Sequence, residues 1–239
     1  MGRIQLDGAA FAFGDGEPLF RGVSLAFEPG WTGVVGPNGG GKSTLLQVLA
    51  GQLALGAGFR HGPASEDVVL CSQRVDEPSP EVRALAGSLE RRALRWQGVL
   101  GLHAQQLDRW ESLSPGERRR WQLGAALSAE PEVLLLDEPT NHVDVEAREH
   151  ILGALSRFRG VGVLVSHDRA LLDALVQQIV WLEDGVARVY RGGYAEARAQ
   201  REREHESAVA MRDGLRAQQR ELDRRVAEER RAAEAASRN

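Results

Sequence analysis

Two adjacent acids, Asp137 and Glu138, end a short apolar run, residues 133–136, that reads Val-Leu-Leu-Leu. Such a run is typical of a strand buried on both faces of a parallel sheet. Ligands of open α/β sheets bind outside the carboxyl ends of the strands, so both carboxylates are expected near a ligand. A solvated turn would also tolerate two acids, but Pro139 fixes the backbone directly after them. The pair is therefore a candidate for metal binding and for proton transfer.

A glycine-rich segment, residues 36–44, fits the pattern G-x-x-x-x-G-K-S/T. Residues 31–35 predict a strand before it, and residues 42–53 predict an amphipathic helix after it. Alone, such a loop could be only a turn, but in this context its N–H groups can surround phosphate oxygens. Lys42 is expected to reach the β- and γ-phosphates, and the Ser43 hydroxyl to ligate Mg²⁺. The predicted phosphate-binding residues are Gly36, Pro37, Asn38, Gly39, Gly40, Gly41, Lys42, Ser43 and Thr44.

Lys42 is the only lysine in the chain, and every other member of the 30 basic residues is an arginine. A composition this biased uses arginine wherever a generic cation suffices. The lysine stands where a compact ammonium is needed and a broad guanidinium would fit poorly. Since there is one such lysine, the chain holds one nucleotide site or half of a shared pair.

Residues 113–117 read Leu-Ser-Pro-Gly-Glu and have the pattern of a helix start. Ser114 is the expected N-cap, Pro115 the first helical residue and Glu117 the capping-box partner, with the helix continuing through residue 127. A capping box by itself needs no further function. Its place ahead of the acidic pair in the chain makes it a candidate for one.

Another apolar run, residues 163–165, ends in Ser166, His167 and Asp168. A lone histidine is more often structural than functional. At the end of a predicted parallel strand, beside the other strand ends, His167 becomes a candidate phosphate contact.

Taken in order, these motifs resemble the ATP-binding cassette (ABC) family over roughly residues 2–193. The glycine-rich loop resembles Walker A, residues 134–138 resemble Walker B with its adjoining glutamate, and residues 113–117 are similar to the family signature. The resemblance implies an ATPase that binds ATP and Mg²⁺. In it Glu138 would activate the attacking water and His167 would contact the γ-phosphate. The predicted catalytic residues are Glu138, His167 and Lys42.

The same resemblance implies the remaining site residues. Phe13 is similar to the aromatic residue that stacks on adenine, with Phe11 as the alternative, and Gln73 falls at the Q-loop position. Ser114 and Gly116 would complete the site of a second cassette, so a single chain is expected to hydrolyse ATP poorly. The predicted nucleotide contacts outside the loop are Phe13, Gln73, Ser114, Gly116, Glu117 and, from the D-loop-like residues 142–144, Asp144. The predicted metal ligands are Ser43, Gln73 and Asp137.

Within the family, residues 137–144, Asp-Glu-Pro-Thr-Asn-His-Val-Asp, are similar to the ABC-F branch of soluble ATPases that act on ribosomes. Residues 166–169 and Glu117 also resemble that branch. Pro115 departs from the pattern, because it replaces the first glycine of the signature and removes one N–H. Members of the branch carry two cassettes joined by a linker. The chain therefore resembles an N-terminal half, ending inside the first linker helix.

The expected fold class is α/β, a P-loop nucleotide hydrolase of ABC type. A mostly parallel core sheet is expected to carry an antiparallel layer from residues 4–27, strands at 133–136 and 161–165 around a helix at 145–158, and a closing hairpin at 179–190. The expected domains are residues 1–192, a nucleotide-binding domain with a helical subdomain at about 76–128, and residues 193–239, a charged helical linker.

The C-terminal stretch is dominated by Ala, Arg, Glu and Gln. A thin apolar stripe at coiled-coil-like spacing, interrupted by Gly214, comprises Met211, Leu215, Leu222 and Val226. The stretch is either a solvated helix or one arm of a helical hairpin that reaches RNA. The candidate phosphate contacts on such an arm are Arg224, Arg225, Arg230 and Arg231.

Bulk composition limits the partners. A net charge of −4 gives no global attraction to nucleic acid, so any RNA contact must be local. The lone cysteine, Cys71, excludes an internal disulfide and fits a reducing cytosol, so a cytoplasmic location is expected. There is no signal-peptide pattern and no apolar run of roughly twenty residues that could span a bilayer.

Three functions remain. The first is a ribosome-acting ABC-F protein in translation regulation or antibiotic protection, with a second cassette and ribosomal RNA as partners. The second is the ATPase subunit of a transporter that pairs with a separate membrane permease. The third is a binding module in which nucleotide only controls assembly. Residues 73–113 favour the first, because transporter cassettes are generally longer there.

Overall fold

The computed structural model describes residues 2–14, 16–73 and 75–236, without the side chains of residue 217 and of those from 221 onward. The contacts divide the chain into two units, Met1–Ala197 and Arg198–Asn239. The following sequence-predicted side chains lie outside the described residues: Leu222, Val226, Arg224, Arg225, Arg230 and Arg231.

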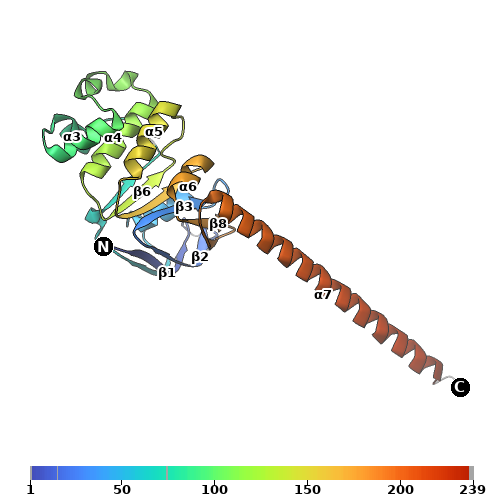
Figure 1. Ribbon diagram of the computed structural model, residues 1–239. Helices are drawn as coiled ribbons and strands as arrows, with labels where there is room; N and C mark the ends of the chain where they lie inside the picture. Colours follow the sequence, from blue (N-terminus) through green and yellow to red (C-terminus); the bar gives the residue numbers. More distant parts are fainter. Residues whose placement is uncertain (1, 15, 74, 237–239) are drawn as a thin grey trace. The chain divides into compact units, whose positions relative to one another are not determined.

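A six-stranded sheet forms the centre of the first unit (Figure 1). Five of its strands are parallel and the last is antiparallel to its neighbour. The predicted α/β class with a mostly parallel core is therefore confirmed. The closing hairpin turns at Asp184 and Gly185, whose φ values of 51° and 74° suit a two-residue turn. In sheet order the strands are β5 (Val68–Cys71), β6 (Val133–Asp137), β7 (Val161–Val165), β3 (Gly30–Val35), β8 (Gln178–Glu183) and β9 (Val186–Arg191).

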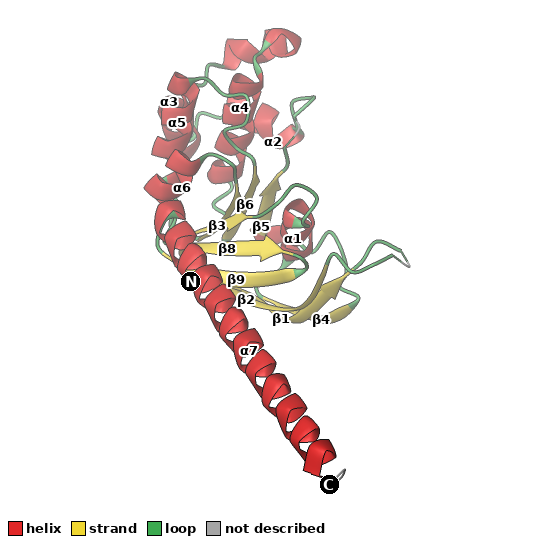
Figure 2. Ribbon diagram, turned by 90° about the vertical axis from the view of Figure 1, so that its right-hand side faces the viewer, coloured by secondary structure: helices red, strands yellow, loops and turns green. Residues whose placement is uncertain are grey.

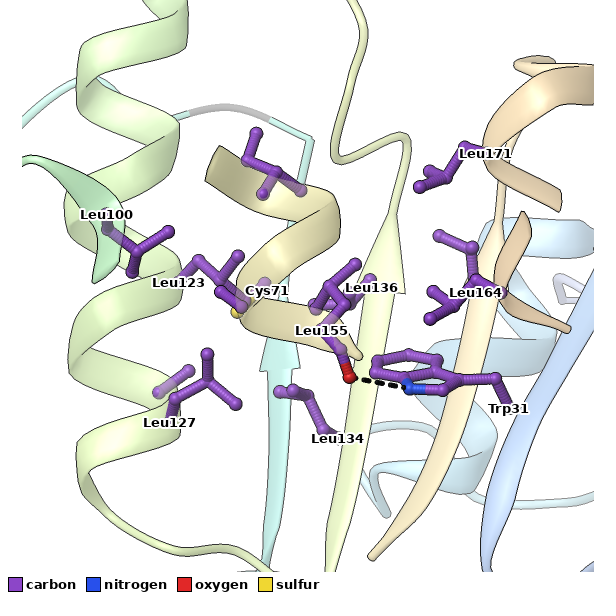
Figure 3. Packing of buried hydrophobic residues seen from close by; sticks show 14 of the residues in the cluster. Trp31, Cys71, Leu100, Leu123, Leu127, Leu134, Leu136, Leu155, Leu164 and Leu171 are labelled. Carbon is purple, nitrogen blue, oxygen red and sulfur yellow. Dashed lines mark hydrogen bonds between the residues drawn. The ribbon is translucent and has the colours of Figure 1, made fainter. Parts of the chain in front are cut away.

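Residues of β6 alternate between two hydrophobic cores because successive side chains of a strand point to opposite faces. Leu134 and Leu136 enter the core that the helices cover (Figure 3). Val133 and Leu135 enter the core on the other face. In the first core Trp31 Nε1 donates a hydrogen bond of 3.0 Å to the Leu155 carbonyl oxygen. Both faces of the sheet are therefore covered, which keeps its strand ends in a fixed position.

An antiparallel layer covers the second core (Figure 2). It comprises β2 (Phe20–Phe27), β1 (Ile4–Phe11) and β4 (Ala57–His61), in that order. Helix α1 (Lys42–Leu49) contributes Leu45, Leu46 and Leu49 to the same core. The helix is shorter than predicted: it ends at Leu49 and not at residue 53, because Gly51 adopts a left-handed φ of 73°.

Helices α3, α4 and α5 lie together in Figure 1, beside the helix-covered core. Leu89 and Leu94, two of the apolar positions read from the sequence in this region, are 87% and 47% exposed, while Trp96 and Trp110 are buried. Helix α5 ends at residue 155, three residues before the predicted end. The helices are α2 (Pro80–Gly87), α3 (Arg91–Leu100), α4 (Pro115–Ser128), α5 (Val145–Leu155), α6 (Arg169–Leu175) and the 3₁₀ segments η1 (Ser65–Asp67) and η2 (Ala104–Ser112).

The last helix, α7 (Tyr194–Ala236), has 43 residues and continues through Gly214. Met211 and Leu215, two residues of the predicted stripe, are 70% and 58% exposed. None of the helices in the described part of the chain combines the length and the apolar character that a membrane span requires.

Candidate nucleotide-binding site

One cavity, of about 600 Å³, gathers residues from four predicted motifs. Its lining comes from the glycine-rich loop, the ends of β6 and β7, and the segment that follows β5. These strands are parallel neighbours, so their carboxyl ends meet at one edge of the sheet. The lining residues are Phe13, Leu19, Asn38, Gly39, Gly41, Lys42, Ser43, Thr44, Gln73, Asp137, Glu138, Asn141, Val165 and His167.

The glycine-rich loop requires glycine at both of its ends. Gly36 has φ 152°, and a Cβ there would lie 2.0 Å from the Leu182 carbonyl oxygen. Gly41, directly before α1, has φ 90°, and a Cβ there would lie 2.8 Å from Leu19 Cδ2. Any larger residue would displace the loop from β8 or from the segment before β2. The pattern read from the sequence therefore has a steric cause in this fold.

The Lys42 ammonium is held inside the loop. Its Nζ donates to the carbonyl oxygens of Gly36 at 3.0 Å and Pro37 at 2.8 Å. Burial lowers the pKa of Lys42, and the nearby carboxylates of Glu138 and Asp137 counteract that shift. The side chain is thus a partly desolvated cation whose present partners are neutral carbonyl groups, and phosphate oxygens would be stronger partners.

Glu138 has an unusual backbone and an unusual carboxylate. Its φ is 50°, a left-handed value for a residue other than glycine. Its Oε2 accepts a hydrogen bond of 3.2 Å from the His167 backbone N–H, and His167 Nε2 lies 3.5 Å from its Oε1. Within the described residues, Oε1 is buried and accepts no hydrogen bond.

Burial raises the pKa of Glu138, and the backbone N–H and side chain of His167 partly oppose this shift. A carboxylate with a raised pKa and one open acceptor position has the properties of a general base. The cavity is therefore able to receive a phosphorylated ligand and to accept a proton beside it.

The residues after β7 are held by a polar network. Asp168 caps α6 by accepting from the Leu171 N–H at 3.1 Å, and its other oxygen accepts from the Thr140 hydroxyl at 3.2 Å. Arg148 of α5 forms an ion pair with the same carboxylate. This network connects the segment after β6 to the segment after β7, and it fixes the backbone of His167.

Phe13 and Gln73 are far apart in the sequence but line the same cavity. Phe13 is 61% exposed and contacts the buried Phe11 edge-on, with 4.9 Å between ring centroids. Phe11 is 7% exposed, so of the two candidates Phe13 is the ring that a base could reach. The buried Arg119 of α4 donates to the carbonyl oxygens of Ser72 and Gln73 and fixes the segment that carries Gln73.

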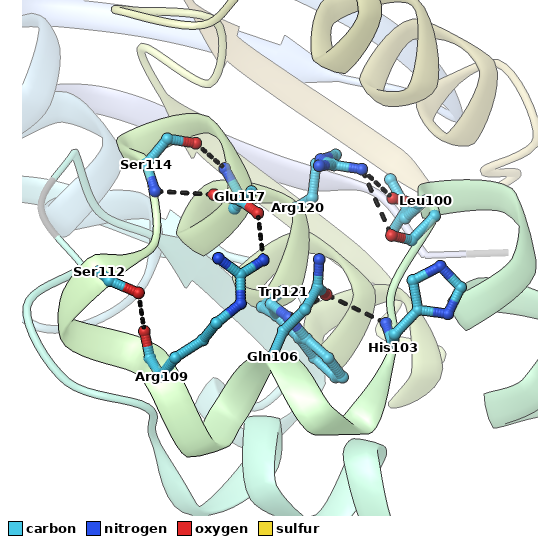
Figure 4. A network of polar contacts seen from close by, with 10 residues as sticks. Leu100, His103, Gln106, Arg109, Ser112, Ser114, Glu117, Arg120 and Trp121 are labelled. Carbon is cyan, nitrogen blue, oxygen red and sulfur yellow. Dashed lines mark hydrogen bonds and ion pairs between the residues drawn. The ribbon is translucent and has the colours of Figure 1, made fainter.

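The signature-like residues lie outside this cavity. The Glu117 N–H donates to Ser114 Oγ at 3.2 Å, and the Ser114 N–H donates to Glu117 Oε2 at 2.8 Å, so the predicted capping box is confirmed (Figure 4). Gly116 is buried, and a Cβ there would be in ordinary contact with Val143. Asp144 caps α5 through the Ala147 N–H at 2.7 Å.

Sequence reasoning missed several residues of the site. Asn141 lines the cavity and its N–H donates to the Glu138 carbonyl oxygen at 3.2 Å, although its place inside the acidic motif could have indicated it. Leu19 forms part of the lining and packs beside Gly41, a contact between distant segments that no local pattern signals. Arg119 is the middle residue of three consecutive arginines, and nothing in the sequence distinguishes it from its two neighbours.

The donor set at the cavity fits Mg²⁺. Ser43, Gln73 and Asp137 contribute hydroxyl, amide and carboxylate oxygens to the same lining, and oxygen is the ligand that Mg²⁺ prefers. One or two carboxylates with phosphate oxygens and water is a usual arrangement for this ion.

The chain is similar in sequence and in fold to known proteins. Residues 20–141 match the family model described as ABC transporter. The ATP-binding protein Uup from Caulobacter vibrioides is 37% identical over 188 residues, which cover 77% of this chain and 31% of that protein. The energy-dependent translational throttle protein EttA from Mycobacterium tuberculosis is 31% identical over 219 residues, which cover 72% of this chain and 39% of that protein.

These relatives are ABC-F proteins, as the sequence resemblance predicted, and the chain spans about a third of their length. Among solved structures, the crystal structure of a nucleotide-free ATP-binding cassette from an ABC transporter superimposes with a TM-score of 0.67. The match covers 80% of this chain and 92% of that one at 18% identity, and it shows the fold alone. The matched family model includes the glycine-rich loop, the signature-like segment and the acidic pair, and the chain therefore belongs to the ATP-binding cassette family.

Proposed function

We propose that this chain is the ATP-hydrolysing cassette of an ABC-F protein that acts on the ribosome, in translation regulation or antibiotic protection. The observation that carries the ATPase part is the cavity in which Lys42, Asp137 and Glu138 meet. A P-loop lysine, a metal-binding acid and a base at one sheet edge are the parts that phosphoryl transfer to water requires.

In this proposal, the backbone of residues 36–44 and the Lys42 ammonium hold the phosphates, and Phe13 stacks on adenine. Lys42 exchanges the carbonyl oxygens of Gly36 and Pro37 for phosphate oxygens. Ser43, Gln73 and Asp137 hold Mg²⁺, which when bound neutralises charge on the phosphate oxygens.

Glu138 orients the attacking water and accepts its proton. The support is its buried Oε1, which accepts no hydrogen bond within the described residues, and its raised pKa. His167 lies at the mouth of the same cavity, with its side chain 61% exposed, and contacts the γ-phosphate.

Ser114, Gly116, Glu117 and Asp144 serve the site of a second cassette, either a second copy or another part of a longer protein. Their positions outside the cavity of their own chain support this assignment. Since each site then needs two cassettes, we expect the isolated chain to turn ATP over slowly.

Two observations support a ribosomal partner. One relative is named as a translational throttle protein, which places that relative in translation. In this chain the proposed nucleotide-binding domain, residues 1–192, with its helical subdomain at about 76–128, is followed by the proposed linker, residues 193–239, which contains the 43-residue charged helix α7.

The test is ribosome co-sedimentation of Glu138→Gln with ATP, since blocked hydrolysis should trap the ATP-bound form. We expect binding at low salt that falls steeply as salt is raised. Truncation after Gly192 should reduce the binding and leave ATP affinity unchanged. Absence of co-sedimentation at every salt concentration, together with capture of a membrane permease, would replace this proposal by the transporter subunit.

A further inference from the structure

A second cavity, of about 860 Å³, lies away from the nucleotide site. It is formed by the first turns of α3, the end of α4 and the segment that joins α5 to β7. The lining residues are Arg91, Arg92, Arg95, Trp96, Leu127, Glu130, Pro131, Arg157, Phe158, Arg159 and Gly160. Its volume is in the range of ligand sites and is too large for a single bound water.

The rim of this cavity is strongly basic. Five arginines and one acid, Glu130, contribute to its lining. Arg92 Nη1 forms an ion pair of 2.8 Å with Glu130, so these two charges offset one another. Four guanidinium groups remain in a protein whose net charge is −4. This concentration of positive charge is local, and the one acid of the lining, Glu130, is already paired with Arg92.

The arginines of the rim keep donors available. The Arg91 side chain makes no hydrogen bond or ion pair within the part of the chain that is described. Arg159 donates through Nη1 to the carbonyl oxygens of Ser156 at 2.9 Å and Phe158 at 3.3 Å. These two carbonyl groups follow the C-terminal end of α5. A guanidinium carries five N–H groups, so a capping role leaves the others free to bind an anion.

The floor of the cavity is apolar and belongs to the packed core. Trp96 and Leu127 are buried in the helix-covered core, and Phe158 packs against it. The Arg95 guanidinium lies 5.2 Å from the Trp96 ring centroid, a cation–π contact that orients it at the rim. Charged groups held on a fixed surface bind an anion with little loss of conformational entropy.

The position of the cavity excludes a role in ATP binding. Pro131 and Gly160 come just before β6 and β7, whereas Asp137 and His167 come at their opposite ends. A five-residue strand spans roughly 15 Å. A ligand here therefore occupies the other edge of the sheet and does not touch the nucleotide.

The structure assigns to this cavity the binding of RNA phosphate groups. Planar guanidinium groups pair with phosphate oxygens through two parallel hydrogen bonds, and a groove with several of them follows a sugar–phosphate backbone. The identification of that RNA as ribosomal rests on the proposed function. The cavity thus provides a contact in the cassette itself, separate from α7.

The test is fluorescence anisotropy of a labelled 12-nucleotide single-stranded RNA, with the full chain and saturating Mg-ATP so that the nucleotide site is filled. The test variant combines Arg91→Gln, Arg95→Gln and Arg159→Gln. The matched control removes the same charge from exposed arginines elsewhere and combines Arg3→Gln, Arg21→Gln and Arg83→Gln. Replacement of the three test positions by lysine keeps the charge and checks that the cavity folds.

We expect the test variant to bind the RNA at least tenfold more weakly than the control at low salt. Each lost phosphate contact should lower the slope of log affinity against log salt by about 0.7, so three should lower it by about two. The lysine variant should retain most of the salt dependence. Equal affinities and slopes for test and control variants would overturn the assignment, as would tighter binding of a polyglutamate probe than of RNA.

The same variants separate this inference from the ribosomal function. Wild-type RNA binding that depends on the cavity, without ribosome co-sedimentation, would reject the function and leave the cavity as an RNA site. Ribosome co-sedimentation that is undiminished in the test variant, with unchanged RNA affinity, would reject the cavity and leave the function.

Discussion

The nucleotide cavity and the signature-like segment differ in how their polar groups are satisfied. Lys42 Nζ is partly buried and donates to carbonyl oxygens of the loop. Glu138 Oε1 accepts no hydrogen bond within the described residues. Ser114 and Glu117, by contrast, satisfy each other's backbone groups in a closed capping box. The first region therefore keeps a cation and a carboxylate oxygen that can still bind a ligand in one cavity. In the second region the polar groups of the helix start are already paired with each other (Figure 4).

The difference indicates where function can be read from a single chain. Unsatisfied buried groups and left-handed backbone at Glu138 reduce stability, so they indicate a ligand. A satisfied cap stabilises its helix and needs no ligand. The role proposed for the signature-like segment therefore depends on a second cassette, and changes in the two regions should have different consequences.

The largest expected effect is on turnover in Glu138→Gln. The amide keeps the shape of the carboxylate but cannot accept a proton, so we expect ATP hydrolysis to fall by about 10²- to 10⁴-fold while ATP binding persists. Phosphate release and binding of a fluorescent ATP analogue measure the two quantities. Wild-type turnover in this variant would contradict the assignment of the base, and Glu146→Gln, at an exposed position of α5, serves as the control.

The second effect is protection of Lys42 by ATP. A lysine-selective acylating reagent can label only Lys42 and the N-terminal amine, since the chain has no other lysine. At Mg-ATP a hundredfold above Kd, labelling of Lys42 should fall about a hundredfold, because only the unbound fraction reacts. Mass spectrometry measures it, with the N-terminal amine as internal control. Equal labelling with and without ATP would exclude the phosphate contact.

The third effect is a stability change in the signature-like segment. Ser114→Ala removes the cap of α4 and should lower the free energy of unfolding by about 1 kcal/mol. For a domain of this size that corresponds to a fall in Tm of about 2–4 °C. ATP affinity of the isolated chain should not change, because Ser114 lies outside the cavity. Loss of ATP affinity without loss of Tm would show that the segment serves its own site.

The smallest effect is a pH-dependent stabilisation by Glu138→Gln. Burial raises the pKa of Glu138 in the folded state, so the ionised form destabilises the fold above that pKa. The amide removes this penalty, and the variant should have a higher Tm than wild type at neutral pH. The difference should shrink as the pH falls through the folded pKa, because wild type then binds a proton. A Tm difference independent of pH would contradict this account.

Much of the fold could be read from local pattern. Strand β6, the hairpin across Asp184 and the capping box of α4 depend on residues within a few positions of each other, so periodicity and turn chemistry predict them. The sequence-based predictions were wrong where contacts between distant segments determine the end of a helix or the burial of a side chain. Helix α5 ends three residues early, and Leu94 is exposed while Trp96 takes the core position, because packing against other elements selects which apolar residues are buried.

The residues of the candidate site also fall into two groups, those that local pattern predicts and those that only the tertiary structure brings together. The residue types at positions 36–44 and 137–138 predict phosphate and metal chemistry, because glycine, lysine and carboxylates at that spacing act through backbone geometry and charge. Only the tertiary structure brings Phe13, Gln73 and His167 to one cavity. Only it buries Glu138 Oε1 with no hydrogen bond from the described residues and His167 Nε2 3.5 Å away.

The basic cavity depends on tertiary structure alone. Its arginines occur near residues 91–95 and 157–159, two segments that show no common pattern in the sequence. Sequence determines which charges exist and which short segments become helices and strands, because those choices depend on neighbours along the chain. The fold decides which charges face the same space, because that depends on how the helices pack on the two faces of the sheet.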